Sequence, residues 1–138
     1  MNPLDWQLTI DSRDPHTLSD FWAEVLGYEL EDHHDQITEL LAAGQVDETL
    51  TVRHHDRLSW VIGAALRGAD RRILFTRVPE PKTVKNRWHI DLNVGRPRVA
   101  EEVARIEGLG GTQLREVEEW GQYHVVMQDP EGNEFCVQ

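Results

Sequence analysis

The stretch QLTIDSRDP, residues 7–15, decides the fold because the chain repeats its pattern as HIDLNVGRP, residues 89–97. Both stretches alternate polar and apolar residues and then reach a proline, and they are offset by 82 residues (89 − 7 = 82). Each proline opens an amphipathic stretch that closes on Leu-Gly, at Leu26-Gly27 and at Leu109-Gly110. Alternation is typical of a strand, and 3.6-residue spacing is typical of a helix. The sequence therefore predicts one strand–turn–helix unit built twice, with a ligand site between the copies.

The first copy carries clear signals for the boundaries of its helix. Asp14 is a good N-cap residue, Pro15 suits the first helical position, and Gly27 suits the left-handed residue that ends a helix. The pattern is weaker beyond this helix. We expect further strands at residues 28–31, 59–66 and 72–78, and a short helix within the otherwise irregular region 32–58.

The second copy repeats the plan with different residues. Its first strand, residues 88–94, places apolar side chains on one face and His89 and Asp91 on the other. Pro97 is expected to start the helix, which should end at the following glycine pair. The turn sequence DPEG then predicts a hairpin whose strands are residues 123–128 and 133–138. Each copy is therefore predicted to be a βαβββ module.

Composition limits the classes of partner and compartment. A length of 138 residues with 39% hydrophobic content fits one soluble globular domain. The net charge of −11 argues against nucleic acid and anionic membrane surfaces as partners. No apolar run approaches the ~20 residues of a membrane span, and no signal-peptide pattern opens the chain, so we expect a cytoplasmic protein. Cys136 is the single cysteine, which leaves no intrachain disulfide.

The order of these motifs resembles the vicinal-oxygen-chelate superfamily, which includes glyoxalase I, bleomycin-resistance proteins and extradiol dioxygenases. The residues that carry the resemblance are the helix start Asp14-Pro15, the pair Phe21-Trp22, the Leu26-Gly27 helix end, the His89 strand and the terminal DPEGN at residues 129–133. The stretch VPEPKTVKNR, residues 78–87, resembles a sub-branch called glyoxalase-like.

The resemblance implies an α+β fold in which two βαβββ modules form a cupped mixed sheet. It implies a single glyoxalase-like domain over residues 4–138, with module one at 4–79, an inter-module loop at 80–86 and module two at 87–138. The modules would close on each other within one chain, or they would swap between the two chains of a homodimer.

The resemblance also implies where metal ligands belong, namely on the first and last strands of each module. By position, Gln7 and His89 match the first-strand ligands. The last strand of module two should carry a glutamate seven residues after the Asp of its Asp-Pro turn, where this chain has Cys136, while Glu134 comes two residues earlier. The last strand of module one, ILFT at residues 73–76, offers no carboxylate. Half of the implied ligand set is therefore missing.

The residues leave the metal chemistry open. A group of Gln7, His89, Glu134 and Cys136 suits a divalent ion such as zinc, nickel or iron. Alternatively, Cys136 is a small buried hydrophobe and His89 simply hydrogen-bonds a neighbour. A Cys136–His89 nucleophile pair is a third alternative. Because the ligand set is incomplete, we expect no tightly bound cofactor.

Polar and aromatic side chains predict the ligand contacts. The candidates are Thr9, Trp60, Phe75, Arg87, Asp91 and Trp120. Their aromatic members would stack on a flat ligand, and the arginine would bind an acidic group through two parallel hydrogen bonds. Trp6, Trp22 and Trp88 are predicted to lie in the core instead. The histidine pairs at 33–34 and 54–55 are predicted to be solvated surface, because adjacent strand residues point to opposite faces.

Three function classes stay open. We favour a small-molecule-binding glyoxalase-like protein with an incomplete metal site that sequesters a planar or aromatic ligand, because lost carboxylates matter more to catalysis than to sequestration. The second class is an enzyme, namely a metal-dependent lyase, isomerase or dioxygenase with an altered ligand set. The third class is a non-catalytic structural or regulatory module.

Overall fold

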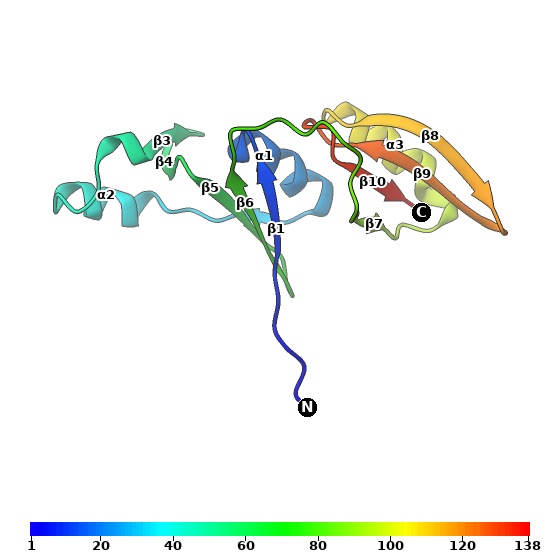
Figure 1. The fold of residues 1–138 in the computed structure, drawn as a ribbon, viewed down its shortest axis with the longest axis horizontal. Helices are drawn as coiled ribbons and strands as arrows, with labels where there is room; N and C mark the ends of the chain where they lie inside the picture. The colour runs from blue at the N-terminus through cyan, green and yellow to red at the C-terminus, as the bar shows by residue number, and fades with distance from the viewer. The chain divides into compact units, whose positions relative to one another are not determined.

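The computed structural model describes residues 1–138, and the chain separates into two compact units (Figure 1). Unit one spans Met1–Pro79, and unit two spans Glu80–Gln138. Each unit contains one four-stranded sheet. No helix in the chain has the length and apolar character needed to cross a membrane.

The sheet of unit one is built from strands at both ends of the unit. Its members are β1 (Leu8–Ser12), β2 (Glu29–Leu30), β5 (Gly63–Arg67) and β6 (Arg72–Arg77). They lie in the order β1-β6-β5-β2, with β1 parallel to β6 and the other neighbours antiparallel. The first and last strands of the module are therefore adjacent, as Figure 1 shows.

One helix, α1 (Pro15–Leu26), packs its apolar stripe against this sheet, and it begins and ends where its boundary signals predict. The Asp14 carboxylate accepts hydrogen bonds from the backbone N–H and the hydroxyl of Thr17, and Gly27 ends the helix with φ 67°. The buried side chains of the helix include Leu18, Phe21, Trp22 and Val25. They lie against β5 and β6, whose buried apolar side chains include Leu66, Ile73 and Phe75. The predicted helix is confirmed at both ends.

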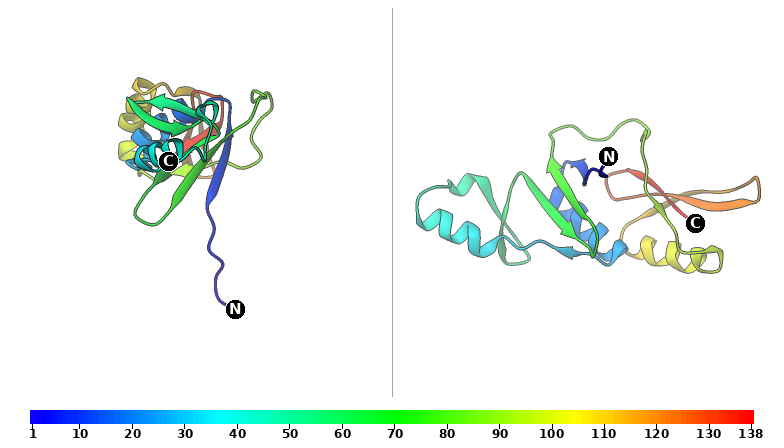
Figure 2. Two further views of the ribbon diagram at one scale, coloured as in Figure 1. Left: turned by 90° about the vertical axis from the view of Figure 1, so that its left-hand side faces the viewer. Right: turned by 90° about the horizontal axis from the view of Figure 1, so that it is seen from below.

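An insertion separates β2 from β5 and occupies the region that the sequence pattern left irregular. It contains α2 (His34–Ala42), a 3-10 turn η1 (Glu48–Leu50), and the hairpin of β3 (Thr51–His54) and β4 (Arg57–Trp60). The predicted short helix is confirmed, and its Ile37 is fully buried. In Figure 2 the insertion, coloured cyan to green, extends beyond the strands of the unit-one sheet.

The single strand predicted at residues 59–66 is wrong, because the chain changes partner in its middle. Trp60 ends β4, whose partner is β3, and Gly63 begins β5, whose partner is β6. Between them, the Val61 N–H donates to the Leu50 carbonyl, and the Ile62 carbonyl accepts from Arg77. Residues 59–66 are one continuous run in the sequence, but the two halves of this run pair in different sheets.

Unit two repeats the topology of unit one without an insertion. It contains β7 (Asp91–Leu92), η2 (Arg96–Arg98), α3 (Val99–Gly108), β8 (Thr112–Glu119), β9 (Gln122–Gln128) and β10 (Glu134–Val137). The strand order is β7-β10-β9-β8, again with the first and last strands parallel. The predicted hairpin is confirmed, and its turn is held by Asp129, which accepts from the N–H groups of Glu131 and Asn133. Pro97 lies in the 3-10 turn, so the α-helix itself begins at Val99.

Two of the three tryptophans predicted to be core are exposed. Trp22 is only 2% exposed, whereas Trp6 is 63% and Trp88 is 90% exposed. Both exposed residues precede the first paired residue of their strand, which is Leu8 in β1 and Asp91 in β7. The ring of Trp6 stacks under the guanidinium of Arg71 at 3.9 Å. The prediction extended strand alternation to residues that are not paired in a sheet, and it therefore assigned the wrong burial to Trp6 and Trp88.

Candidate functional site

The sheet face of unit two that lies away from α3 brings three metal-ligand side chains together. Asp91 of β7 and Cys136 of β10 are direct neighbours in the parallel register, and His89 precedes β7 by two residues. The Nε2 atom of His89 lies 3.2 Å from a carboxylate oxygen of Asp91. One ligand atom from each residue lies within 4.8 Å of the others. We call this set the β7–β10 group.

The thiol of Cys136 is held in its protonated form. Burial raises the pKa of Cys136, and the neighbouring Asp91 carboxylate raises it further by charge and by a hydrogen bond. Arg115 and Lys85 act in the opposite direction but do not cancel these effects. Because the thiolate is the reactive and metal-binding form, this thiol is a poor nucleophile as it stands. The raised pKa, and not the distance between the two side chains, argues against the Cys136–His89 nucleophile pair.

Glu134 is engaged elsewhere and does not join the β7–β10 group. Its carboxylate lies 3.0 Å from the Lys82 ammonium and accepts a 3.0 Å hydrogen bond from the Asn86 N–H. Burial alone would raise the pKa of Glu134, but the Asn86 and Lys82 contacts together hold it below its ordinary value. The predicted group of four therefore loses Glu134, and Asp91 stands beside His89 and Cys136 instead.

On the corresponding face of unit one, Gln7 lies in a network of charged side chains. Its amide oxygen accepts from Arg72 at 3.3 Å, and its amide nitrogen lies 3.4 Å from the Thr9 hydroxyl. Arg72 binds Glu31 through two hydrogen bonds of 2.7 and 3.0 Å, and Arg67 adds a third of 2.9 Å. These bonds, with that from Arg72 the strongest, lower the pKa of Glu31. Sequence reasoning missed Glu31, because its partners are 36 and 41 residues away.

Phe75 cannot belong to the aromatic ligand wall predicted from sequence. Phe75 is fully buried, because strand alternation puts it on the same face as Ile73, under α1. Trp120 is 96% exposed and has φ 57° in the turn between β8 and β9. Trp60, another of the predicted aromatic residues, lines a pocket. Arg87 is exposed in the segment before β7, where it is free to meet a ligand.

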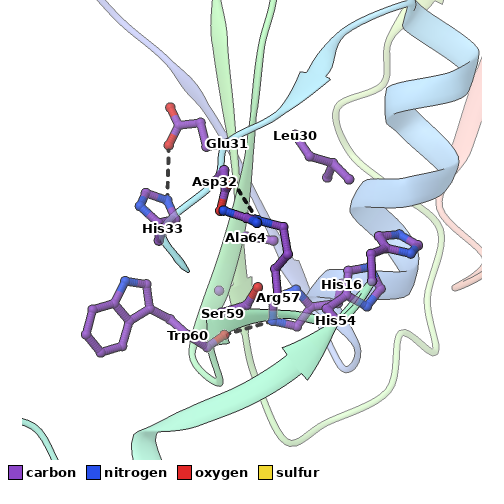
Figure 3. Close-up of a pocket in the computed structure, with 12 residues that line it drawn as sticks. His16, Leu30, Glu31, Asp32, His33, His54, Arg57, Ser59, Trp60 and Ala64 are labelled. Carbon is purple, nitrogen blue, oxygen red and sulfur yellow. Dashed lines mark hydrogen bonds and ion pairs between the residues drawn. The ribbon is translucent and has the colours of Figure 1, made fainter. Parts of the chain in front are cut away.

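That pocket lies within unit one and has a volume of about 250 Å³. Its walls come from the start of α1, from β2, from the insertion and from the start of β5 (Figure 3). The residues that define it include His16, Leu30, His54, Arg57, Trp60 and Ala64. Sequence periodicity could not find this pocket, because the insertion carries much of its lining.

The structure also overturns the prediction for the histidine pair at 54–55. His55 and Asp56 both have left-handed backbone conformations, with φ 50° and 59°. Strand alternation therefore ends at His54, and both imidazoles turn toward the same carboxylate, that of Asp20 on α1. The pair is not simply solvated surface.

A model of the glyoxalase-like domain matches residues 7–138 of the chain. The chain belongs to this family. A comparison with curated proteins found no match.

Solved structures share the fold of this glyoxalase-like domain. A glyoxalase/bleomycin resistance protein/dioxygenase family enzyme from Burkholderia phytofirmans PsJN gives a TM-score of 0.64 at 19% identity, covering 95% of this chain and 94% of that one. The fosfomycin resistance protein FosX from Mesorhizobium loti gives 0.67 at 12%, covering 100% and 92%. A mutant of FosX from Listeria monocytogenes, in complex with Mn(II) and 1S,2S-dihydroxypropylphosphonic acid, gives 0.65 at 13%, covering 100% and 90%. These likenesses confirm the predicted α+β fold.

Proposed function

We propose that this glyoxalase-like domain binds a small acidic molecule at the polar face of unit two, around His89 and Arg87, and does not catalyse metal-dependent chemistry there. The main support for the proposal comes from two side chains of β10, the carboxylate of Glu134 and the thiol of Cys136. Glu134 is tied to Lys82 and Asn86, and Cys136 keeps its proton. The carboxylate is therefore engaged by its partners, and the thiol carries no charge that would attract a cation.

Charge supports an acidic ligand. The chain carries a net charge of −11, yet cationic groups gather beside the β7–β10 group, where Lys85 and Arg115 act electrostatically on Cys136. Arg87 is exposed two residues before His89, and a guanidinium binds a carboxylate or phosphonate through two parallel hydrogen bonds. The complex of the Listeria FosX with a phosphonic acid is consistent with this ligand class. The planar part of the ligand prediction is supported by Trp60, which lines the pocket of unit one.

A thermal-shift screen of acidic and neutral small molecules on untagged protein tests the proposal, with fosfomycin among the acidic probes. Arg87→Ala should weaken acidic ligands about ten- to a hundred-fold, because a charge-assisted hydrogen bond contributes ~1.5–3 kcal/mol. Arg77→Ala, which removes an exposed arginine at the end of β6, is the matched control. Equal weakening of acidic and neutral ligands by Arg87→Ala would refute the site.

The β7–β10 group favours a second candidate function, a metal-dependent enzyme. One imidazole, one carboxylate and one thiol fit zinc, nickel or iron better than Mn(II), which prefers oxygen ligands. A bound ion would act there as a Lewis acid, and its charge would favour loss of the Cys136 proton. Elemental analysis of protein purified without a tag or chelator separates the two candidates. We expect well under one equivalent of metal that depends on His89, and a full equivalent that is lost in His89→Ala would favour the enzyme candidate instead.

A further inference from the structure

Three metal-ligand side chains meet where the insertion touches α1. Both carboxylate oxygens of Asp20 lie 2.9–3.0 Å from Nε2 of His54. They also lie 3.0 Å from Nε2 of His55, and the two imidazole centroids are 4.0 Å apart. All three residues belong to unit one, so this cluster is separate from the β7–β10 group.

The distances match those between ligands that share one ion. Ligands bound at about 2.0–2.1 Å lie about 3.0–3.4 Å apart, depending on whether they subtend a right angle or the tetrahedral angle. The distances from the two Nε2 atoms to the Asp20 carboxylate oxygens, 2.9 and 3.0 Å, lie at the short end of this range. Two imidazoles and one carboxylate form a ligand set typical of first-row divalent metals, with positions left open for water or a ligand.

The backbone accepts strain to bring the second histidine into place. The β3–β4 turn holds His55 and Asp56 in the left-handed region, where Asn-Gly would be the least costly pair. A left-handed residue other than glycine costs about 1–2 kcal/mol. Strain of this kind is a reason to look for function at the residue that bears it.

A purely structural clamp would not need this arrangement. His16 already fastens the hairpin to α1, because its Nε2 lies 2.8 Å from the Trp60 carbonyl. His54 alone would satisfy the Asp20 carboxylate. The second imidazole, which is 63% exposed, is therefore surplus to holding the elements together.

An ion and a ligand can both reach the cluster. The side chains of Asp20 and His54 are 32% and 23% exposed, so the nitrogen and oxygen atoms are not sealed in the core. His54 and His55 also line the 250 Å³ pocket, which Figure 3 shows with His16 beside His54. A ligand in the pocket would therefore meet the open side of an ion held by these residues.

We infer that Asp20, His54 and His55 form a binding site for a divalent first-row transition metal of the zinc class, on the insertion and outside the β7–β10 group. The site faces the pocket of unit one. Bound metal links α1 to the β3–β4 hairpin, so it stabilises the insertion as well as presenting a Lewis acid to the pocket.

Calorimetric titration of the untagged protein with Zn²⁺ tests the inference. His55→Asn is the decisive variant, because asparagine tolerates the left-handed conformation and removes only the imidazole. It should weaken Zn²⁺ binding by more than about 100-fold, since losing even an outer-shell partner of a ligand costs about 10–100-fold. Asp20→Asn, which keeps the shape of the side chain, should do the same.

Two controls make the outcome specific. His33→Ala removes an imidazole that pairs with Glu31 at 3.4 Å on the opposite side of the pocket, and it should leave Zn²⁺ binding unchanged. When Co²⁺ replaces Zn²⁺, the wild type should show a visible absorption spectrum and His55→Asn should lack it. Wild-type Zn²⁺ affinity in His55→Asn would overturn the inference and leave a hydrogen-bonded clamp. Loss of binding in His89→Ala alone would place the ion in the β7–β10 group instead.

Discussion

At the scale of the residue, the environment of Cys136 determines whether the polar face of unit two can do covalent chemistry. Its neighbours are an apolar interior and the Asp91 carboxylate, both of which oppose ionisation. The position is the one where the resemblance implied a metal-binding glutamate. Unlike a glutamate, the thiol at this position is small and carries no charge at neutral pH.

We predict that alkylation of Cys136 by iodoacetamide is slower at pH 8 than that of a free cysteine, and accelerates only in more alkaline solution. The raised pKa also has a consequence for stability. Its contribution is fully present below the pKa of the unfolded thiol and is lost as the pH rises through the folded value. Unfolding of the wild type in urea should therefore become easier above about pH 8.5, and this dependence should be weaker in Cys136→Ala. Rapid alkylation at pH 7 would contradict the assignment.

Glu134 gives the opposite dependence on pH. Its lowered pKa contributes stability that is present above the ordinary value of about 4.5 and is lost as the pH falls through the folded value. The side chain is only 12% exposed, so replacing it in Glu134→Gln should cost about 1–3 kcal/mol at pH 7 and less at pH 3. Glu107→Gln, at an exposed position of α3, serves as the control and should change stability by less than about 0.5 kcal/mol. Equal losses at both pH values would contradict the role of the charge.

At the scale of the element, the start of β5 tolerates no side chain at Gly63. A Cβ atom there would lie 2.7 Å from the Phe75 carbonyl of the paired strand, which cannot move without breaking the sheet. Gly63→Ala should therefore destabilise unit one by roughly 1–3 kcal/mol. Gly108→Ala, in α3, meets nothing within 4 Å and has no positive φ, so it should stabilise the protein by about 0.5–1 kcal/mol. Chemical denaturation of the two variants checks both signs.

The elements differ in how far sequence predicts them, and the reason is physical. The helix α1 follows from local signals, since a cap, an N1 proline and an ending glycine lie within or beside it. The hairpin β9–β10 likewise follows from its turn. The insertion does not, because its contacts with α1 join residues more than thirty positions apart.

The candidate site shows the same division. Alternation put Asp91 and Cys136 on polar faces, and the two residues are direct neighbours in the register of β7 and β10. It failed for His55, where two left-handed residues reverse the chain. It also could not show that Glu134 is engaged by Lys82, which comes from a loop without periodicity. The expectation that Gln7 and His89 face one cavity stays a prediction.

At the scale of the whole molecule, the predicted repeat is visible as one strand order shared by both units. In each sheet the first strand lies beside the last, followed by the third and then the second. The units differ in how strongly the first strand is held. Five residue pairs join β1 to β6, whereas two join β7 to β10. The unit with the longer ladder also carries the insertion.

This strand order has a mechanical consequence. The chain enters unit one at β1 and leaves it after β6, and the two strands run in parallel side by side. Tension applied to the two ends of the unit therefore loads the hydrogen bonds between them in shear, all at once, rather than opening them one after another. Because forced unfolding is governed by the unfolding rate, the five-pair ladder should make unit one rupture at a higher force than unit two when the chain is stretched between its ends. Optical tweezers would then record two steps of unequal height, with Cys136 and its neighbours released in the lower one.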